Sequence, residues 1–110
     1  KSLPQGDLEI TASLNALARL YKEQGRYKEA EKYFEEVLQI RRASLPKEDQ
    51  CIAFSLNNLA QLYYLQERYD EAEPLYEETL KIATEALGEH HAYTQLVQQQ
   101  IQRFLLEKML

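Results

Sequence analysis

Several residue types are scarce in this chain, and each shortage excludes a class of protein. Cys51 is the only cysteine among 110 residues, so no disulfide can form within the chain and no thiolate cluster can bind a metal. This cysteine usage is compatible with a reducing compartment, and we expect a cytoplasmic protein. No apolar run approaches the length of a membrane span, and residues 1–7 lack the apolar core of a secretion signal.

Residues of positive charge are also in the minority, since 13 Lys and Arg stand against 18 Asp and Glu. The resulting net charge of −5 argues against a nucleic-acid-binding surface, and we expect no membrane partner either. Glycine and proline are rare as well, with three of each. Because these residues interrupt regular structure, their scarcity favours long helices.

The residues that catalysis or metal binding would need do not form a recognisable set. His90 and His91 are adjacent, so their side chains point in different directions, and a capping or turn role is the better interpretation. Cys51 has no histidine near it in the sequence, and the acidic pairs 35–36 and 77–78 are typical of solvated helix faces. The sequence therefore predicts a protein that is not an enzyme and that needs no cofactor or metal.

An internal repeat is the strongest positive feature of the sequence. Residues 11–52 align without a gap on residues 53–94, and 18 of the 42 aligned positions are identical. A fixed period of this size indicates a protein built from stacked repeats. The identical pairs include Leu14/Leu56, Asn15/Asn57, Leu17/Leu59, Ala18/Ala60, Leu20/Leu62, Tyr21/Tyr63, Tyr27/Tyr69, Ala30/Ala72 and Leu38/Leu80.

Apolar residues recur at a spacing of three and four, which predicts helices and almost no strand. We expect five helices joined by short turns, so that neighbouring helices are antiparallel. Their expected ranges are about 8–24, 27–44, 48 or 49 to 66, 70–87 and 91–108.

Local signals mark where these helices begin and end. Residues 1–6 are expected to be a frayed lead-in, with Asp7 as the N-cap of the first helix. Gly25 should end that helix in a left-handed conformation. Glu67 replaces this glycine in the second repeat, so that turn must tolerate a different or more strained geometry. Pro46 should stop the second helix, and we expect Pro74 in the first turn of the fourth.

The apolar stripes predict which helix faces are buried. The first helix is expected to turn Ile10, Leu14, Leu17, Ala18 and Tyr21 inward, and the last helix Tyr93, Val97, Ile101, Phe104 and Leu105. Polar residues of the last helix replace part of the face that a further repeat would cover, as in a capping helix. Residues 104–110 are mostly apolar, and either fold back on the fourth helix or form a partner surface.

The repeated residues resemble the tetratricopeptide repeat, a helix–turn–helix unit. The resemblance rests on Leu17-Ala18, Tyr21, Gly25, Tyr27, Ala30 and Phe34, and on their counterparts in the second repeat, where the glycine is lost. The 42-residue period is similar to that of kinesin light chains and many bacterial members of the family. HEAT and armadillo repeats have comparable periods but lack this Tyr/Ala/Tyr pattern.

The resemblance implies an all-α, right-handed α-solenoid that forms a single domain over residues 1–110. Two helical hairpins, at about 8–46 and 49–88, would be followed by a capping helix at about 91–108. It also implies a non-catalytic scaffold that binds an extended peptide or a partner helix in a concave groove. Carried over from the family, the groove positions are Asn15, Arg19, Lys22, Asn57, Asn58, Gln61, Tyr64, Gln99 and Arg103.

Each of these positions also has a plainer interpretation. Asn15 and Asn57 could clamp a peptide backbone, because an amide both donates and accepts, or they could brace neighbouring helices. Arg19, Lys22 and Arg103 would favour an acidic ligand, or belong to a solvated helix face. Tyr64 is either a stacking platform or one more exposed aromatic residue. The alternative function is self-assembly, or spacing of other domains, and the expected state is a monomer or a weak homodimer.

Overall fold

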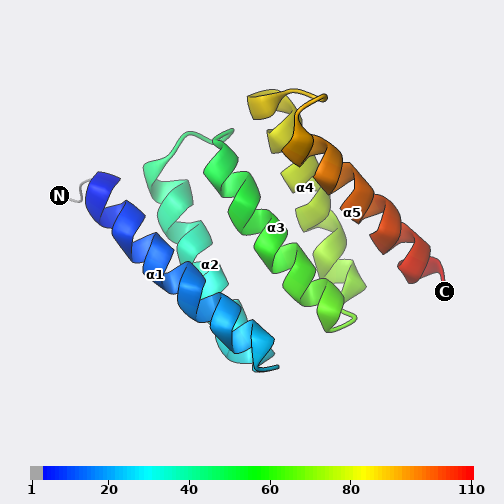
Figure 1. Ribbon diagram of the computed structural model, residues 1–110, viewed down its shortest axis with the longest axis horizontal. Coiled ribbons are helices and arrows are strands. Elements are labelled where there is room, and N and C mark those ends of the chain that lie inside the picture. The colour runs from blue at the N-terminus through cyan, green and yellow to red at the C-terminus, as the bar shows by residue number, and fades with distance from the viewer. Residues whose placement is uncertain (1–3) are drawn as a thin grey trace.

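The computed structural model describes residues 4–110, with side chains from residue 8 onward, and this part of the chain contains helices and no strand. The five helices are α1 Pro4–Glu23, α2 Tyr27–Ser44, α3 Gln50–Leu65, α4 Tyr69–Leu87 and α5 Ala92–Met109. Their existence and order confirm the prediction of an all-α chain. Neighbours run in opposite directions, so α1, α3 and α5 are parallel to one another (Figure 1).

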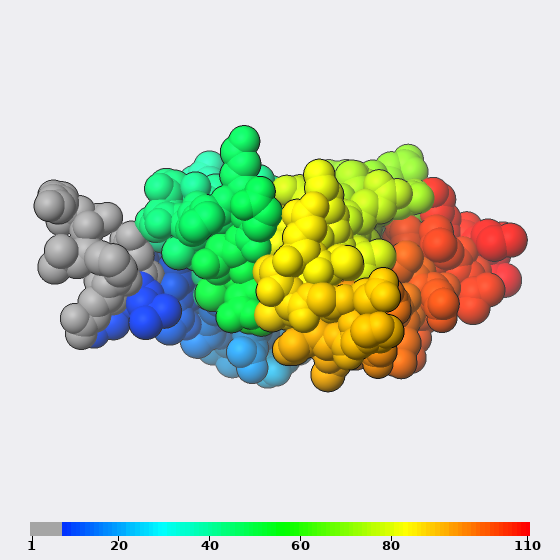
Figure 2. Space-filling view, turned by 90° about the horizontal axis from the view of Figure 1, so that it is seen from above, coloured from blue at the N-terminus to red at the C-terminus, as the bar shows by residue number. Residues whose placement is uncertain are grey.

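The helices stack in chain order into an α-solenoid. Each helix packs against the one before it and the one after it. The molecule measures 48 × 34 × 20 Å, and α1 and α5 lie toward opposite ends of its long axis (Figure 2). Tertiary structure therefore consists almost entirely of contacts between successive elements, as expected for a stack of repeats.

The turns inside the two hairpins share one backbone geometry. Gly25 has a φ of +78°, and Glu67, at the equivalent position, has a φ of +60°. Glycine adopts this left-handed conformation without steric penalty, whereas the Cβ of Glu67 meets the backbone. Of the two outcomes expected for Glu67, a different or a more strained turn, the structure shows the strained one. Gly88, with a φ of +93°, ends α4.

The beginning of α1 differs from the expectation. Pro4 is the first residue of the helix, so Pro4 and Gly6 do not break it, and Asp7 lies within the helix rather than capping it. Proline is well suited to the first helical position, because its fixed φ matches the helix and its missing N–H would have had no partner there.

Other helix ends have clear local causes. Leu45 is extended, with φ −122° and ψ 156°, as the residue before Pro46 must be to avoid a clash. Asp49 caps α3 by accepting from the Cys51 N–H at 2.8 Å. Pro74 was expected in the first turn of α4, but it is the sixth residue counted from Tyr69. The helix tolerates it there because only the carbonyl of Asp70, an exposed residue, loses its helical donor.

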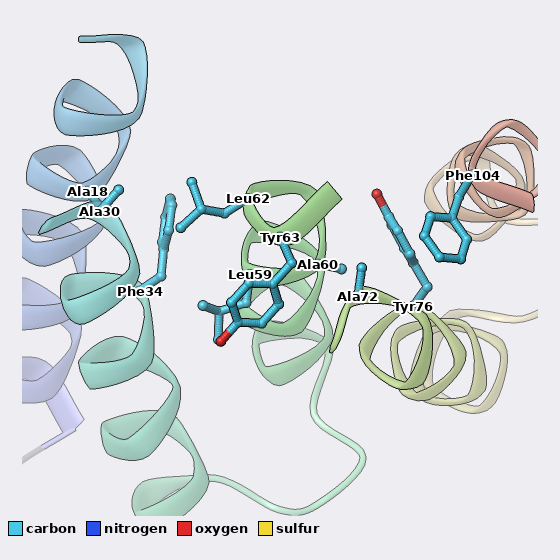
Figure 3. Close-up of a cluster of buried hydrophobic side chains, with 10 residues drawn as sticks. All are labelled: Ala18, Ala30, Phe34, Leu59, Ala60, Leu62, Tyr63, Ala72, Tyr76 and Phe104. Atoms are coloured by element: carbon cyan, nitrogen blue, oxygen red, sulfur yellow. The ribbon is translucent and has the colours of Figure 1, made fainter. Parts of the chain in front are cut away.

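The core forms where pairs of alanines let helices cross closely. Ala18 and Ala30 meet between α1 and α2, and Ala60 and Ala72 meet between α3 and α4 (Figure 3). All four are fully buried, so a larger side chain would push the paired helices apart. Aromatic side chains fill the spaces between the hairpins, and Phe104 connects α5 to the same cluster.

The predicted apolar faces are correct for the middle of the stack and wrong near its ends. Ile10 and Leu17 were expected to be buried but are exposed, because no described element lies against that side of α1. Leu105 is likewise exposed, whereas Val97 and Phe104 of α5 are buried as predicted. The apolar end of α5 is anchored to α4 by an ion pair between Lys108 and Glu73.

Candidate functional site

A hollow of about 260 Å³ opens on the surface that α1, α3 and α5 form together. We call this hollow the groove. Because α3 lies between α1 and α5 in Figure 1, the hollow has α3 at its centre and the other two helices at its sides. Four of the predicted groove residues meet here, together with three that the prediction did not include. The lining residues are Lys22, Gln61, Tyr64, Leu65, Tyr76, Gln100 and Arg103.

Aromatic side chains form one wall of the hollow. The ring of Tyr64 lies 6.2 Å from that of Phe104, and the ring of Tyr76 lies 5.2 Å from Phe104. Burial raises the pKa of Tyr76 to about 12. Burial, together with a hydrogen bond to the Glu107 carboxylate, also raises the pKa of Tyr64. Both phenols therefore stay neutral at physiological pH.

Two cations stand on opposite sides of this aromatic wall. Lys22 reaches the hollow from α1, and Arg103 reaches it from α5. Among the described residues neither side chain forms an ion pair with a carboxylate, and the amides of Gln61 on α3 and Gln100 on α5 line the same hollow. This arrangement combines apolar area, amide donors and acceptors, and positive charge within one concavity, as sites that bind peptides commonly do.

Asn15 and Arg19 lie in a different place. They line a wider hollow of about 530 Å³ along α1, to which Ala12, Ala16, Leu20, Glu23 and Arg41 also contribute. Asn58, which is half-buried, and Gln99, which is exposed, line neither hollow. The structure thus places four of the nine predicted residues at the central hollow and these four outside it.

Asn57 braces two helices. Its side chain is buried, and its Nδ2 donates to the hydroxyl of Tyr93 on α5 at 3.2 Å. Asn15 occupies the equivalent position in the first repeat, but Cys51 stands where Tyr93 would be, so the same bond cannot form. The observed contact favours the bracing interpretation of Asn57 over a peptide clamp.

Three buried amide oxygens have no hydrogen-bond partner among the described residues: Asn15 Oδ1, Asn57 Oδ1 and Gln100 Oε1. A buried acceptor without a donor costs about 1–3 kcal/mol. Gln100 is the informative case, because it also lines the groove. The Oε1 atom of Gln100 is an acceptor to which the N–H of a bound chain could donate.

Sequence reasoning missed Tyr76, Leu65 and Gln100. Tyr76 belongs to a second helix, and the predicted groove residues came only from the first helix of each hairpin and from the last helix. Gln100 follows Asn58 at the 42-residue period, so the repeat alignment contained the signal needed to find it. Leu65 carries no such signal, because an apolar residue at a helix end is indistinguishable from core in the sequence.

The residues considered for catalysis serve other purposes. His91 caps α5 by accepting from the Tyr93 N–H at 3.0 Å, which confirms the predicted capping role. Burial raises the pKa of the Cys51 thiol, so little reactive thiolate is present near neutral pH. Glu35, from one of the acidic pairs, accepts a hydrogen bond from the Tyr63 hydroxyl at 3.3 Å.

Within residues 4–110, none of the helices is both long enough and apolar enough to cross a bilayer.

A solved structure shares this architecture. The chain is similar to the crystal structure of BtubC (BKLC) from P. vanneervenii, with a TM-score of 0.82 and 27% sequence identity. The similarity covers 90% of this chain but 39% of that chain, so the present chain spans well under half the length of this relative. No curated protein matches the chain.

The family is shown by a separate comparison. A family model described as tetratricopeptide repeat matches residues 10–50 and 53–93, which are the two repeats found in the sequence. Repeats of this family generally mediate protein–protein interactions or act as scaffolds, and they are typically not catalytic. With two matched repeats covering most of its length, and a solved relative of the same fold, the chain belongs to the tetratricopeptide repeat family.

Proposed function

We propose that this chain binds an extended peptide or a partner helix in the groove formed by α1, α3 and α5. The observation that carries the proposal is the hollow of about 260 Å³ in which Lys22, Tyr64 and Arg103 come together from three different helices. A ligand lying across the three helices would contact all of them at once. The site needs no chemical step, which agrees with the usual scaffold role of the family.

The charges in the groove favour an acidic ligand. Lys22 and Arg103 face the hollow, although the chain as a whole has a net charge of −5. Opposite charges on a ligand would speed association and orient it, and this effect would weaken as salt screens the charges. A basic ligand would be repelled at these two positions, so the groove should discriminate by charge.

The amide side chains in the groove are suited to hydrogen bonding with the backbone of a bound peptide. Gln61 on α3 and Gln100 on α5 each carry a donor and an acceptor, and both line the hollow. A ligand N–H that donates to the buried oxygen of Gln100 would form a hydrogen bond that this oxygen lacks in the free protein. Asn15, Arg19, Asn58 and Gln99 would be reached only by a ligand that extends beyond the hollow.

The test is a selection of short random peptides on the immobilised chain, followed by measurement of dissociation constants by fluorescence anisotropy. We expect the enriched peptides to be acidic. The double variant Lys22→Glu with Arg103→Glu should weaken their binding by at least about tenfold, or 1.4 kcal/mol.

The matched control is Lys28→Glu with Lys81→Glu, which changes the net charge equally on exposed positions of α2 and α4. It should leave the dissociation constants within about twofold of the parent chain. If no peptides are enriched, or if both double variants weaken binding equally, the groove is not the binding surface.

A further inference from the structure

A cluster of three oxygen atoms lies at the junction between the two hairpins. The ring of Tyr63 extends from α3 toward α2 (Figure 3), and its hydroxyl oxygen lies 3.1 Å from Glu31 Oε2 and 3.3 Å from Glu35 Oε2. The two glutamates are four residues apart, so they lie on the same face of α2. Two carboxyl groups therefore share one phenolic hydroxyl.

The cluster has too few protons when both carboxyl groups are ionised. A tyrosine hydroxyl has one proton, which it can donate fully to one carboxylate at a time. An ionised carboxylate only accepts hydrogen bonds, so the second one faces the lone pairs of the phenolic oxygen. Burial, followed by the charge of Glu31, raises the pKa of Tyr63, so the hydroxyl keeps its proton near neutral pH. A further proton has to be carried by a carboxyl group.

The surrounding charges favour Glu35 as the group that takes this proton. Arg68 forms an ion pair with Glu31 at 2.8 Å, whereas within residues 8–110 no cationic side chain forms one with Glu35. Partial burial, followed by the charge of Glu31, raises the pKa of Glu35. The hydrogen bond from Tyr63 and the charge of Arg68 act in the opposite direction without cancelling this rise.

The groups that act on Glu35 come from each side of the junction. α2 itself contributes Glu31, α3 contributes Tyr63, and the turn before α4 contributes Arg68. From α4, Glu71 pairs with the same arginine at 2.7 Å. α1 also packs on α2, but among the described residues it adds no charged group to those that shift the pKa of Glu35. When all are ionised, three carboxylates thus share one guanidinium.

We propose that Tyr63, Glu31 and Glu35 form a pH-sensitive clamp between the two hairpins. Glu35 takes one proton from the solvent, its new O–H donates to the Tyr63 oxygen, and Tyr63 donates to Glu31. Each oxygen–oxygen contact of the tyrosine then has its own proton, so the junction between α2 and α3 is strengthened. Loss of that proton leaves both carboxylates competing for one hydroxyl. The groove is lined by other residues, so the proposal does not depend on peptide binding there.

The junction between α4 and α5 cannot form the same clamp. One period after Glu35 comes Glu77, an exposed residue of α4. One period after Tyr63 comes Leu105, which has no hydroxyl to share. Glu77 is therefore a matched control, with the same side chain at the same position of a second helix.

The test compares Glu35→Gln with the parent chain by urea denaturation at pH 7 and at pH 4. Glutamine imitates the protonated carboxyl group, because its amide can donate to the Tyr63 oxygen at any pH. At pH 7 we expect Glu35→Gln to raise the urea midpoint by about 0.3 M, as one additional hydrogen bond would. Glu77→Gln and Glu36→Gln remove the same charge from exposed positions and should shift the midpoint by less than about 0.1 M.

The effect should depend on pH in one direction. Because the pKa of Glu35 in the folded chain lies above its ordinary value of 4.5, the folded state takes up the proton before the unfolded state does. The added stability is fully present below pH 4.5 and is lost as the pH rises through the folded value. The difference between Glu35→Gln and the parent chain should therefore shrink at pH 4 to that of the controls.

Tyr63→Phe gives a second measurement, since it keeps the buried ring and removes the hydroxyl. It should lower the urea midpoint more at pH 4 than at pH 7, because the clamp is complete only when Glu35 is protonated. Three results would overturn the proposal. They are a pH 7 shift for Glu35→Gln no larger than that for Glu77→Gln, a shift that persists in a chain carrying Tyr63→Phe, and an NMR titration midpoint of Glu35 at or below 4.5.

Discussion

Leu20 and Leu62 occupy the same place in two successive repeats, yet half of Leu20 is exposed and Leu62 is completely buried. The same contrast holds for Leu17 and Leu59, and for Ile10 and Ile52. Helix propensity and local spacing are nearly the same in both repeats, so neither can explain the difference. In a stack, the burial of a side chain depends on the adjacent repeat as much as on its own helix.

Polar residues show the same dependence on context. Asn57 is held by the Tyr93 hydroxyl, whereas Asn15 has Cys51 in the corresponding place. Arg68 bridges to the preceding hairpin through Glu31, whereas Arg26 pairs with Glu29 inside its own hairpin. The two repeats can therefore be compared residue by residue, and each equivalent pair gives a matched experiment.

The largest effect should come from the paired leucines. Leu62→Ala removes a fully buried side chain and should lower the free energy of unfolding by about 2–5 kcal/mol. Leu20→Ala removes a side chain that is half exposed, and the loss should stay below about 1 kcal/mol. Urea denaturation followed by circular dichroism measures both. Equal losses would mean that α1 is covered by something in solution.

The hairpin turns should respond in opposite directions. Gly25→Ala puts a Cβ on a backbone with a φ of +78° and should cost about 1 kcal/mol, although the new methyl group meets no atom within 4 Å. Glu67→Gly relieves the same strain at a φ of +60° and should be neutral or stabilising by up to about 1 kcal/mol. Thermal unfolding of the two variants shows whether each substitution raises or lowers the stability. A loss of stability on Glu67→Gly would show that the turn is not strained.

A smaller difference is expected between the equivalent arginines. Arg68→Gln breaks the bridge to Glu31, whose side chain is only 20% exposed, and should cost on the order of 1 kcal/mol. Arg26→Gln breaks an exposed pair and should cost a few tenths of a kcal/mol. Both arginines lie over a tyrosine ring, so the contribution of this cation–π contact to stability cancels when the two variants are compared. Equal urea midpoints for the two variants would contradict the cross-repeat role of Arg68.

The finest distinction lies in the titration of two equivalent glutamates. The hydrogen bond from Arg68 is the main cause that lowers the pKa of Glu71 from its ordinary value of 4.5. A backbone hydrogen bond is the main cause that lowers the pKa of Glu29, followed by the hydrogen bond from Arg26. Because both pKa values are lowered in the folded state, the stabilisation is present above pH 4.5 and is lost as the pH falls through the folded value.

Carboxyl-carbon NMR titration separates the two cases. Arg68→Gln should return the pKa of Glu71 toward 4.5, whereas after Arg26→Gln the backbone hydrogen bond should still hold the pKa of Glu29 below 4.5. Similar changes at both glutamates would mean that the arginine, and not the backbone, dominates in each repeat.

Much of the fold could be predicted because its signals are local. The period of 42, the alanines at the helix crossings and the proline at residue 46 each act through nearby atoms. The start of α1 was mispredicted, since Pro4 suits both a frayed lead-in and a first helical position. Pro74 was assigned to the first turn, although the expected start at residue 70, one residue after the observed start, already made it the fifth residue of α4.

The candidate site was predicted only in part. Lys22, Gln61, Tyr64 and Arg103 could be found because the first helices of successive repeats line one surface, and the repeat alignment identifies them. The sequence does not show that the Asn57 side chain donates to the hydroxyl of Tyr93, because the two residues lie 36 positions apart. Tyr76 could not be assigned to the groove from the sequence, because its position depends on how α4 packs behind α3 and α5.

The sequence by itself determined the helical repeats, their period, their turns and their family, because these follow from spacing, steric preference and side-chain size within one repeat. Only the tertiary structure decided which copies of the same side chain are buried. Burial requires a neighbour, and the neighbour of Leu62 is α2, whereas residues 4–110 provide none for Leu20. The groove and the exposed side of α1 are both consequences of this stacking.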